Sequence, residues 1–318
     1  MDRAVANRPP RLPERAVAAD FVFLLRPAIL LPVWTFFLLG ASHGARAGAA
    51  APVLPLLAGI ASFTAMMGAV YIVNQIADRE SDRANGKLFL LSHGIVPARA
   101  AWTEAALLVA AALAAAALTL PRTFLAALCA GLLLGLGYSL EPVRLKRRPV
   151  LDLVASGLGS GLVNTLAGWT AIGAPLREIF VLAPYPLAVA AVHLLTTLAD
   201  IEGDGACGLR TSGVALGRGK GTVAAGILMT ASAGAAAAAG NTVALICALV
   251  SLPLFMMAAR RGRAADDRAV LMPARAATLC YSAAAAVFYP VYLAWLAAVL
   301  ALTRLYYSRR FGIRYPSI

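Results

Sequence analysis

The chain has 318 residues, of which 61% are hydrophobic and 14% are charged, and it carries a net charge of +13. Soluble domains carry about 25% charged residues, so this composition excludes an ordinary soluble protein and favours a lipid bilayer. The basic residues lie in short patches between apolar runs, as the positive-inside rule predicts for cytoplasmic loops. The charge therefore indicates membrane topology and does not indicate nucleic acid as a partner.

Nine apolar runs are long enough to cross about 30 Å of hydrocarbon as helices, which predicts an all-α polytopic membrane protein. The expected spans are 21–40, 52–77, 100–120, 123–141, 150–173, 178–199, 213–238, 241–259 and 277–302. We divide the chain into a polar cytoplasmic tail at 1–20, a transmembrane domain at 21–303 and a basic tail at 304–318. The first twenty residues lack the apolar core of a cleaved signal peptide, so the first span should remain as an anchor.

The distribution of Lys and Arg predicts a cytoplasmic N-terminus in an inner or plasma membrane. One segment disagrees, because an odd number of spans places the tail "RLYYSRRFGIRYPSI", with its four Arg, on the outer side. Either this tail is an exception to the rule or one span is miscounted. The four Cys are isolated, so they predict neither a zinc site nor a disulfide framework.

The same acidic pattern follows two of the apolar runs. "ADRESD" at 77–82 ends the second span and "ADIEGD" at 199–204 ends the sixth, so both should emerge on the cytoplasmic side. In each copy two aspartates are one helical turn apart, namely Asp78 with Asp82 and Asp200 with Asp204. A single pair could be a solvated helix end, but two matching pairs on one side favour a site.

Acids at this spacing repel each other and need a compensating cation. Oxygen ligands without His or Cys favour Mg²⁺, which commonly shares its coordination shell with phosphate oxygens. Asn74 lies one turn deeper than Asp78 on the same helix stripe. We therefore expect Mg²⁺ and a diphosphate between the two motifs.

Fixed positive charge for a diphosphate is available in the loop "YSLEPVRLKRRPVLD" at 138–152. Arg144 and Lys146 alternate in a segment that Pro142 should keep extended, so both can point toward the acids. Arg147 and Arg148 are more simply a membrane anchor. Further candidates are Lys87 and Arg210, which follow the two acidic motifs at matching distances, and Arg26 at the start of the first span.

Three segments resemble the UbiA-type intramembrane prenyltransferases. "NQIADRESD" resembles their N-x-x-x-D-x-x-x-D signature, "ADIEGDGACGLRT" resembles their second aspartate motif, and "YSLEPVRLK" resembles the loop after their fourth helix. The resemblance implies nine transmembrane helices in a ring around a lipid-open cavity, and transfer of a polyprenyl group from its diphosphate to an acceptor. It also implies Mg²⁺ ligands, which would be Asp78, Asp82, Asp200 and Asp204 with Asn74 assisting.

One stretch departs from the family pattern. Where many members carry N-x-P-x-R-P-x-x-S-G, this chain has "NGKLFLLSHG", with Phe89 at the arginine position and Lys87 at the proline position. We expect Lys87 to supply the missing charge to the diphosphate. Tyr138 would stabilise an allylic cation or orient the diphosphate, although a tyrosine of the interfacial belt is an equally simple interpretation.

Polar residues inside spans are costly and indicate the cavity wall. His193, two turns before Asp200, and Asn164 are candidates to contact the acceptor, and each could instead serve helix packing. The small residues of "GLGSGLVNTLAG" at 157–168 predict a tight helix interface. A membrane terpene cyclase would use the same ions and diphosphate without an acceptor. A secondary transporter is less consistent, since its acids usually lie at the membrane midplane.

Overall fold

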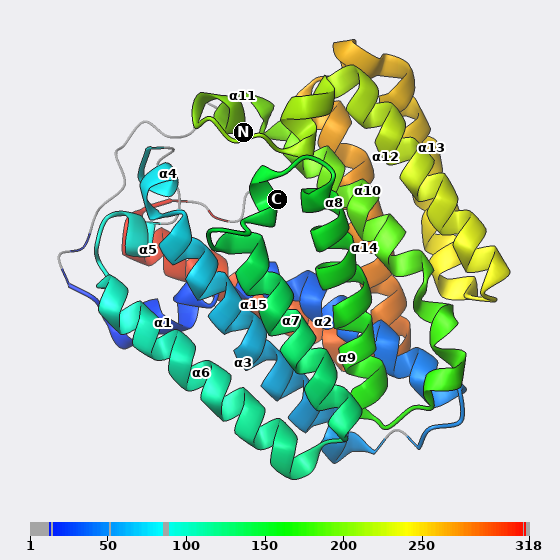
Figure 1. Cartoon of the computed structure of the whole chain (residues 1–318), viewed down its shortest axis with the longest axis horizontal. Coiled ribbons are helices and arrows are strands. Elements are labelled where there is room, and N and C mark those ends of the chain that lie inside the picture. The colour runs from blue at the N-terminus through cyan, green and yellow to red at the C-terminus, as the bar shows by residue number, and fades with distance from the viewer. Residues whose placement is uncertain (1–12, 14, 51, 85–88, 314, 316–318) are drawn as a thin grey trace.

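A computed structural model of the chain describes residues 13, 15–50, 52–84, 89–313 and 315, apart from the side chains of Ser81, Ala84 and Phe89. All regular elements in these ranges are helices, which confirms the all-α class (Figure 1). In chain order they are α1 (Ala18–Leu24), α2 (Pro27–Arg46), α3 (Val53–Ala77), α4 (Arg79–Ala84), α5 (Phe89–Ser92), α6 (Ala98–Thr119), α7 (Arg122–Ser139), η1 (Leu145–Arg147), α8 (Leu151–Ser156), η2 (Gly157–Val163), α9 (Asn164–Ala171), η3 (Leu176–Leu182), α10 (Pro184–Ala199), α11 (Ile201–Ala206), α12 (Ser212–Ala238), α13 (Thr242–Arg261), η4 (Gly262–Ala264), α14 (Asp267–Phe288) and α15 (Val291–Phe311).

Within the described ranges, nine helical stretches are long and apolar enough to cross a membrane. They are α2, α3, α6, α7, η3 with α10, α12, α13 with η4, α14 and α15. Large apolar side chains project outward from them, as at Leu118, which is 84% exposed. Because water would penalise such a surface, the chain is an integral membrane protein. A ring arrangement of the helices stays a prediction.

A further helical column fills the predicted span 150–173. It consists of α8, the π-helical turn η2 and α9, which follow one another without a break. Small residues let this column approach its neighbours closely, as the sequence predicted. A Cβ on Gly161 would lie 2.6 Å from Cα of Pro186 in α10, and one on Gly168 would lie 1.8 Å from the carbonyl oxygen of Phe37 in α2.

Two predicted helix boundaries were wrong, and a proline follows each break. The first span does not begin at 21, because Arg26 has a φ of 58° and Pro27 starts α2, which separates the short α1. The run 277–302 is not one span but parts of α14 and α15, since the helix breaks at Tyr289 before Pro290. A residue that precedes proline is sterically disfavoured in the helical region.

The extra break brings the two ends of the described chain together. Arg310 Nη2 near the end of α15 lies 2.7 Å from Oδ2 of Asp20, and Tyr306 donates a 2.7 Å hydrogen bond to Oδ1 of the same carboxylate. α1 in turn lies beside the end of α3, since Gln75 donates a 2.8 Å hydrogen bond to the carbonyl of Leu24. The basic end of α15 therefore lies beside the N-terminal segment. α15 also continues through the expected boundary between residues 303 and 304.

Candidate active site

The two acidic motifs adopt the same local structure. Asp78 ends α3 with φ and ψ of −100° and 4°, and Asp200 ends α10 with −98° and 8°. A short helix follows each, α4 or α11, and the backbone N–H of the second aspartate donates to the carbonyl of the first, at 2.8 Å for Asp82 and 2.9 Å for Asp204. Both short helices lie at the same end of the bundle (Figure 1). The repeated sequence pattern is therefore a repeated backbone turn.

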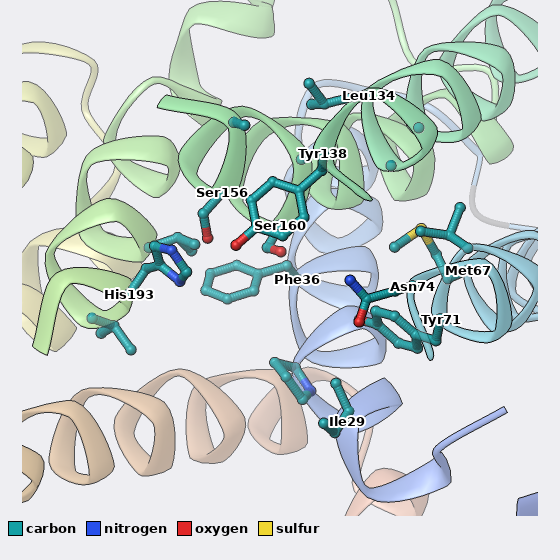
Figure 2. A pocket seen from close by; sticks show the side chains of 18 of the residues that line it. Ile29, Phe36, Met67, Tyr71, Asn74, Leu134, Tyr138, Ser156, Ser160 and His193 are labelled. Carbon is teal, nitrogen blue, oxygen red and sulfur yellow. The ribbon is translucent and has the colours of Figure 1, made fainter. Parts of the chain in front are cut away.

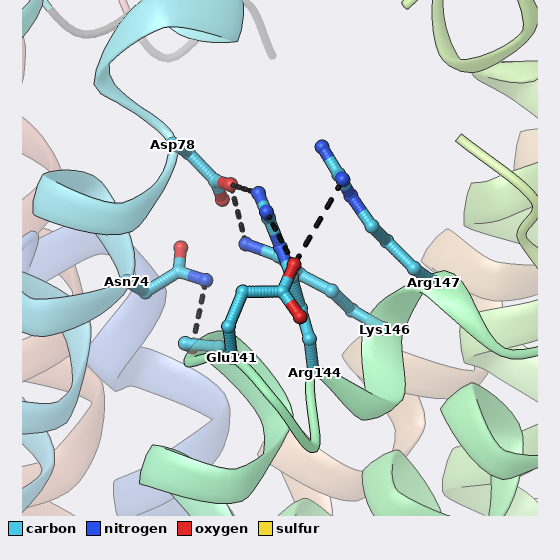
Figure 3. A network of polar contacts seen from close by, with 7 residues as sticks. Asn74, Asp78, Glu141, Arg144, Lys146 and Arg147 are labelled. Carbon is cyan, nitrogen blue, oxygen red and sulfur yellow. Dashed lines mark hydrogen bonds and ion pairs between the residues drawn. The ribbon is translucent and has the colours of Figure 1, made fainter. Parts of the chain in front are cut away.

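Two cations from the loop after α7 contact the first acidic turn (Figure 3). Arg144 Nη2 lies 3.4 Å from Oδ1 of Asp78, and Lys146 Nζ contacts the same oxygen. The side chain of Lys146 is only 11% exposed. Burial lowers the pKa of Lys146 below its ordinary value of 10.5, while the charge of Asp78 acts in the opposite direction. Both cations that the sequence analysis expected near the acids thus contact Asp78.

The local structure of this loop differs from the extended segment that we expected. Arg144 has a φ of 36°, and residues Leu145–Arg147 form a 3₁₀ turn, η1. Glu141 forms ion pairs within this loop. Its Oε1 lies 3.0 Å from Nη1 of Arg144 and 4.0 Å from Nη1 of Arg147. Arg148 donates a 2.9 Å hydrogen bond to the carbonyl of Pro142. The folded turn, and not an extended strand, aims Arg144 and Lys146 at Asp78.

The second acidic turn is backed by hydroxyl groups and a buried acid that the sequence did not suggest. Thr211 Oγ1 donates to Oδ2 of Asp204 at 3.2 Å. The next residue, Ser212, starts α12 and donates its backbone N–H to Asp152 Oδ2 at 2.7 Å, while its hydroxyl contacts the other carboxylate oxygen. Asp152 is fully buried at the start of α8. The cation loop and the second acidic turn are therefore joined through Asp152.

The sequence also offered Lys87, Arg210 and Arg26 as candidate cations for a diphosphate. Lys87 lies outside the described residues. Arg210 is exposed and forms no hydrogen bond or ion pair with the part of the chain that the structure describes. Arg26, in contrast, lines the central cavity at the start of α2, and its Nε is buried without a hydrogen-bond partner among the described residues.

A cavity of about 560 Å³ lies inside the bundle (Figure 2), and its lining includes Asn74, one turn before Asp78, and Thr196, one turn before Asp200. Its lining comes from α2, α3, α7, α8, η2, α10 and α14. Much of the wall is apolar, including Phe36, Met67 and Leu134. Such a wall accommodates a hydrocarbon chain and excludes water from a reaction at its mouth.

Besides Arg26, three predicted site residues line this cavity, whereas the acceptor candidate Asn164 does not. Asn74, Tyr138 and His193 contribute to the wall, and Asn74 donates a 3.0 Å hydrogen bond to the hydroxyl of Ser139. Tyr138 lies one residue before the end of α7, next to Ser139. Asn164 is fully buried outside the lining, and its amide has no partner within the described ranges.

The donor atoms at the two turns fit Mg²⁺. They are carboxylate oxygens with one nearby amide, and Mg²⁺ takes oxygen ligands. In the described ranges no three acidic, His or Cys side chains form a metal cage of their own. Mg²⁺ is typically held by one or two carboxylates and completes its shell with water and phosphate oxygens.

Comparison with solved structures shows the same fold. A UbiA homolog from Archaeoglobus fulgidus bound to GPP and Mg²⁺ superposes with a TM-score of 0.67 at 20% identity, covering 89% of this chain and 99% of that one. The apo structure of a UbiA homolog from Aeropyrum pernix K1 gives a TM-score of 0.63 at 20% identity, covering 86% and 98%. A structure described as digeranylgeranylglyceryl phosphate synthase gives 0.62 at 14% identity, covering 88% and 99%.

Sequence comparison leads to the same family. No curated protein matches the chain by sequence. The model of the UbiA prenyltransferase family, however, matches residues 29–272, a range that includes both acidic turns, the cation loop and most of the cavity wall. The chain therefore belongs to the UbiA prenyltransferase family.

Proposed function

We propose that this protein transfers a polyprenyl group from a polyprenyl diphosphate to an acceptor inside the membrane, with Mg²⁺ as cofactor. The observation that carries the proposal is the pair of matching acidic turns at one end of the bundle, above an apolar cavity. The Archaeoglobus homolog structures bound to GPP or DMAPP together with Mg²⁺ support it.

The residue roles follow from the contacts. Asp78, Asp82, Asp200 and Asp204, with Asn74 assisting, would hold the metal ions. Mg²⁺ bound there would supply Lewis-acid stabilisation of charge on the phosphate oxygens. Arg144 and Lys146 now contact Asp78 and lie where they can bind diphosphate oxygens directly. Tyr138 orients the diphosphate or faces the allylic cation.

In the transfer step the bond between C1 of the prenyl chain and the diphosphate oxygen breaks, and its electron pair leaves with the diphosphate. An acceptor atom forms the new bond to C1, and the acceptor loses a proton to the departing diphosphate or to water. Arg144 and Lys146 stabilise the charge on the leaving group, an electrostatic contribution to catalysis. The apolar wall keeps water from the allylic cation.

The membrane side is part of the proposal. The basic loop at 144–148 and the basic end of α15 lie at the end of the bundle that carries the acidic turns. The positive-inside rule therefore places the site at the cytoplasmic face of an inner or plasma membrane.

The test is release of diphosphate from geranylgeranyl diphosphate by the purified full chain, with and without Mg²⁺. We expect release that requires Mg²⁺ and product formation that requires an added acceptor. Cyclic hydrocarbon products formed without an acceptor would instead identify a terpene cyclase. No release under any condition would remove the proposal.

A further inference from the structure

One wall of the cavity carries polar groups that the proposed diphosphate site does not use. Figure 2 shows Tyr138, Ser156, Ser160 and His193 gathered on one side, while Tyr71 and Asn74 lie on the other. Tyr138 comes from α7, Ser156 ends α8, Ser160 lies in η2 and His193 belongs to α10. Three helical columns therefore direct polar groups to one place inside an otherwise apolar cavity.

The two serine hydroxyls are free to bind a ligand. Serine and threonine inside helices commonly donate to a carbonyl in the preceding turn. Thr196 and Thr278, which also line the cavity, do so, with bonds of 2.7 Å to the carbonyl of His193 and 2.9 Å to that of Ala274. Ser156 and Ser160 make no hydrogen bond to any described residue.

His193 adds an unpaired ring nitrogen to the same wall. Its Nε2 is buried, and it has no hydrogen-bond partner in the ranges that the structure describes. A buried polar group without a partner is costly, so a ligand or water is expected to satisfy it. The adjoining π-helical turn is a further sign, because such turns recur at functional sites.

The electrostatics of this wall disfavour an anion. The charge of the buried Asp152 acts on both Tyr138 and His193. Arg26 is the one Lys or Arg side chain in the described lining, and its charge acts on Tyr71, which Figure 2 places on the other side of the cavity. A carboxylate or phosphate placed beside Ser156 and Ser160 would therefore lie near the buried charge of Asp152, and burying like charges together is unfavourable.

We propose that Ser156, Ser160 and His193 form the acceptor subsite, and that the acceptor is an uncharged molecule that presents hydroxyl groups, a phenol or an alcohol. This inference rests on the proposed prenyl transfer and specifies its acceptor. Hydroxyl groups suit the site because they both donate and accept, as the serines do. The prenyl chain then occupies the apolar part of the cavity, with C1 near Tyr138.

The test compares acceptors that differ in charge. Hydroquinone is uncharged, 4-hydroxybenzoate replaces one of its hydroxyls with a carboxylate, and glycerol 1-phosphate carries a phosphate. With geranylgeranyl diphosphate and Mg²⁺, we expect kcat/KM for hydroquinone to exceed that for both anions by about tenfold or more. Preference for either anion overturns the inference, and so does diphosphate release that leaves hydroquinone unmodified.

A double variant, Ser156→Ala with Ser160→Ala, tests the residues themselves. Two lost hydrogen bonds should raise the KM for hydroquinone about tenfold and weaken its binding to the metal-free protein to the same extent. Thr278→Val is the matched control, because its hydroxyl lines the cavity but is already bonded, and it should leave hydroquinone binding unchanged.

The outcomes distinguish a failure of the acceptor subsite from a failure of the proposed prenyl transfer. Unchanged hydroquinone binding in the double variant overturns the subsite while leaving prenyl transfer in place. Absence of Mg²⁺-dependent diphosphate release in the parent protein removes the proposed function, and the subsite with it.

Discussion

At the end of α3, the first aspartate of the acidic turn lies against Lys146 and Arg144, whereas the matching aspartate at the end of α10 is exposed. The backbone angles of the two turns agree within a few degrees. In the turn after α10, the second aspartate, Asp204, accepts a hydrogen bond from Thr211. The fold thus uses one backbone turn twice and distinguishes the copies through the loops beside them.

This difference suggests a division of labour between the turns. Cations beside Asp78 compensate part of its charge and provide ligands for phosphate oxygens. At the second turn, a chain of hydrogen bonds holds Asp204 in position. It runs through Thr211, Ser212 and Asp152. We therefore expect changes near the first turn to affect prenyl diphosphate most, and changes near the second turn to affect Mg²⁺ most.

Removing either first aspartate should have the largest effect. Asp78→Ala and Asp200→Ala should each lower kcat by about 100-fold or more, because each removes a charge that holds the metal ions. Glu80→Ala and Glu202→Ala are matched controls, since both glutamates are exposed and lie two residues further along the same turns. The assay is diphosphate release by protein that elutes as a folded species in detergent. Retention of a third of the activity in either aspartate variant would exclude that turn from the site.

Removing a cation that contacts the first turn should have the next largest effect, whereas removing a remote cation should matter little. Lys146→Ala should lower kcat/KM for prenyl diphosphate about 10- to 100-fold, because Lys146 is nearly buried against Asp78. Lys146→Arg should restore part of this loss by keeping the charge. Arg210→Ala serves as the comparison and should change kcat/KM by less than about threefold, since its side chain is exposed. Equal losses in both alanine variants would refute the proposed asymmetry between the turns.

The positioning role of Asp152 predicts an intermediate effect. Asp152→Asn should lower kcat/KM about fivefold to twentyfold and raise the Mg²⁺ concentration needed for half-maximal rate, because it weakens the bonds that hold Ser212. In the double variant Asp152→Asn with Ser212→Ala, the losses in kcat/KM should be less than additive, because the two residues are partners in one hydrogen-bond network. Asp267→Asn is the control, since Asp267 pairs with Arg218 away from the cavity lining. An unchanged Mg²⁺ dependence in Asp152→Asn would show that its role is only structural.

Much of this arrangement could be predicted from the sequence because the signals are local. A long apolar run, a D-x-x-x-D pattern and a basic loop each lie within one segment. The apolar runs form helices, the repeated acidic pattern forms a repeated backbone turn, and the basic loop brings Arg144 and Lys146 to Asp78. The run 277–302 was misleading because α14 begins ten residues earlier, at Asp267, where charged residues read as a loop. Pro290 was the available signal for the break, since it follows Tyr289 within an otherwise uninterrupted apolar run.

The features that the sequence did not predict depend on residues far apart in the chain. The sequence did not single out Asp152 in the loop at 138–152, because its partner Ser212 lies sixty residues away. Ser156 lies next to a run of small residues and Ser160 lies within it, and that run correctly predicted close packing against α10. Only the folded column shows that the opposite side of this run faces the cavity. A helix can therefore use one stripe for packing and another for a ligand, and composition alone does not separate them.

The smallest expected effects come from single hydrogen bonds at the two turns, and they distinguish the turns most sharply. Ser139→Ala removes the partner of Asn74, and Thr211→Val removes the partner of Asp204. Each lost bond is worth about 1 kcal/mol, which corresponds to about a fivefold change. Thr103→Val on α6, whose hydroxyl bonds only within its own helix, should change nothing. We expect Ser139→Ala to raise the KM for prenyl diphosphate and Thr211→Val to raise the half-saturating Mg²⁺ concentration. If both variants shifted the same parameter, the two turns would act as one ligand set, because a division of labour requires separate responses.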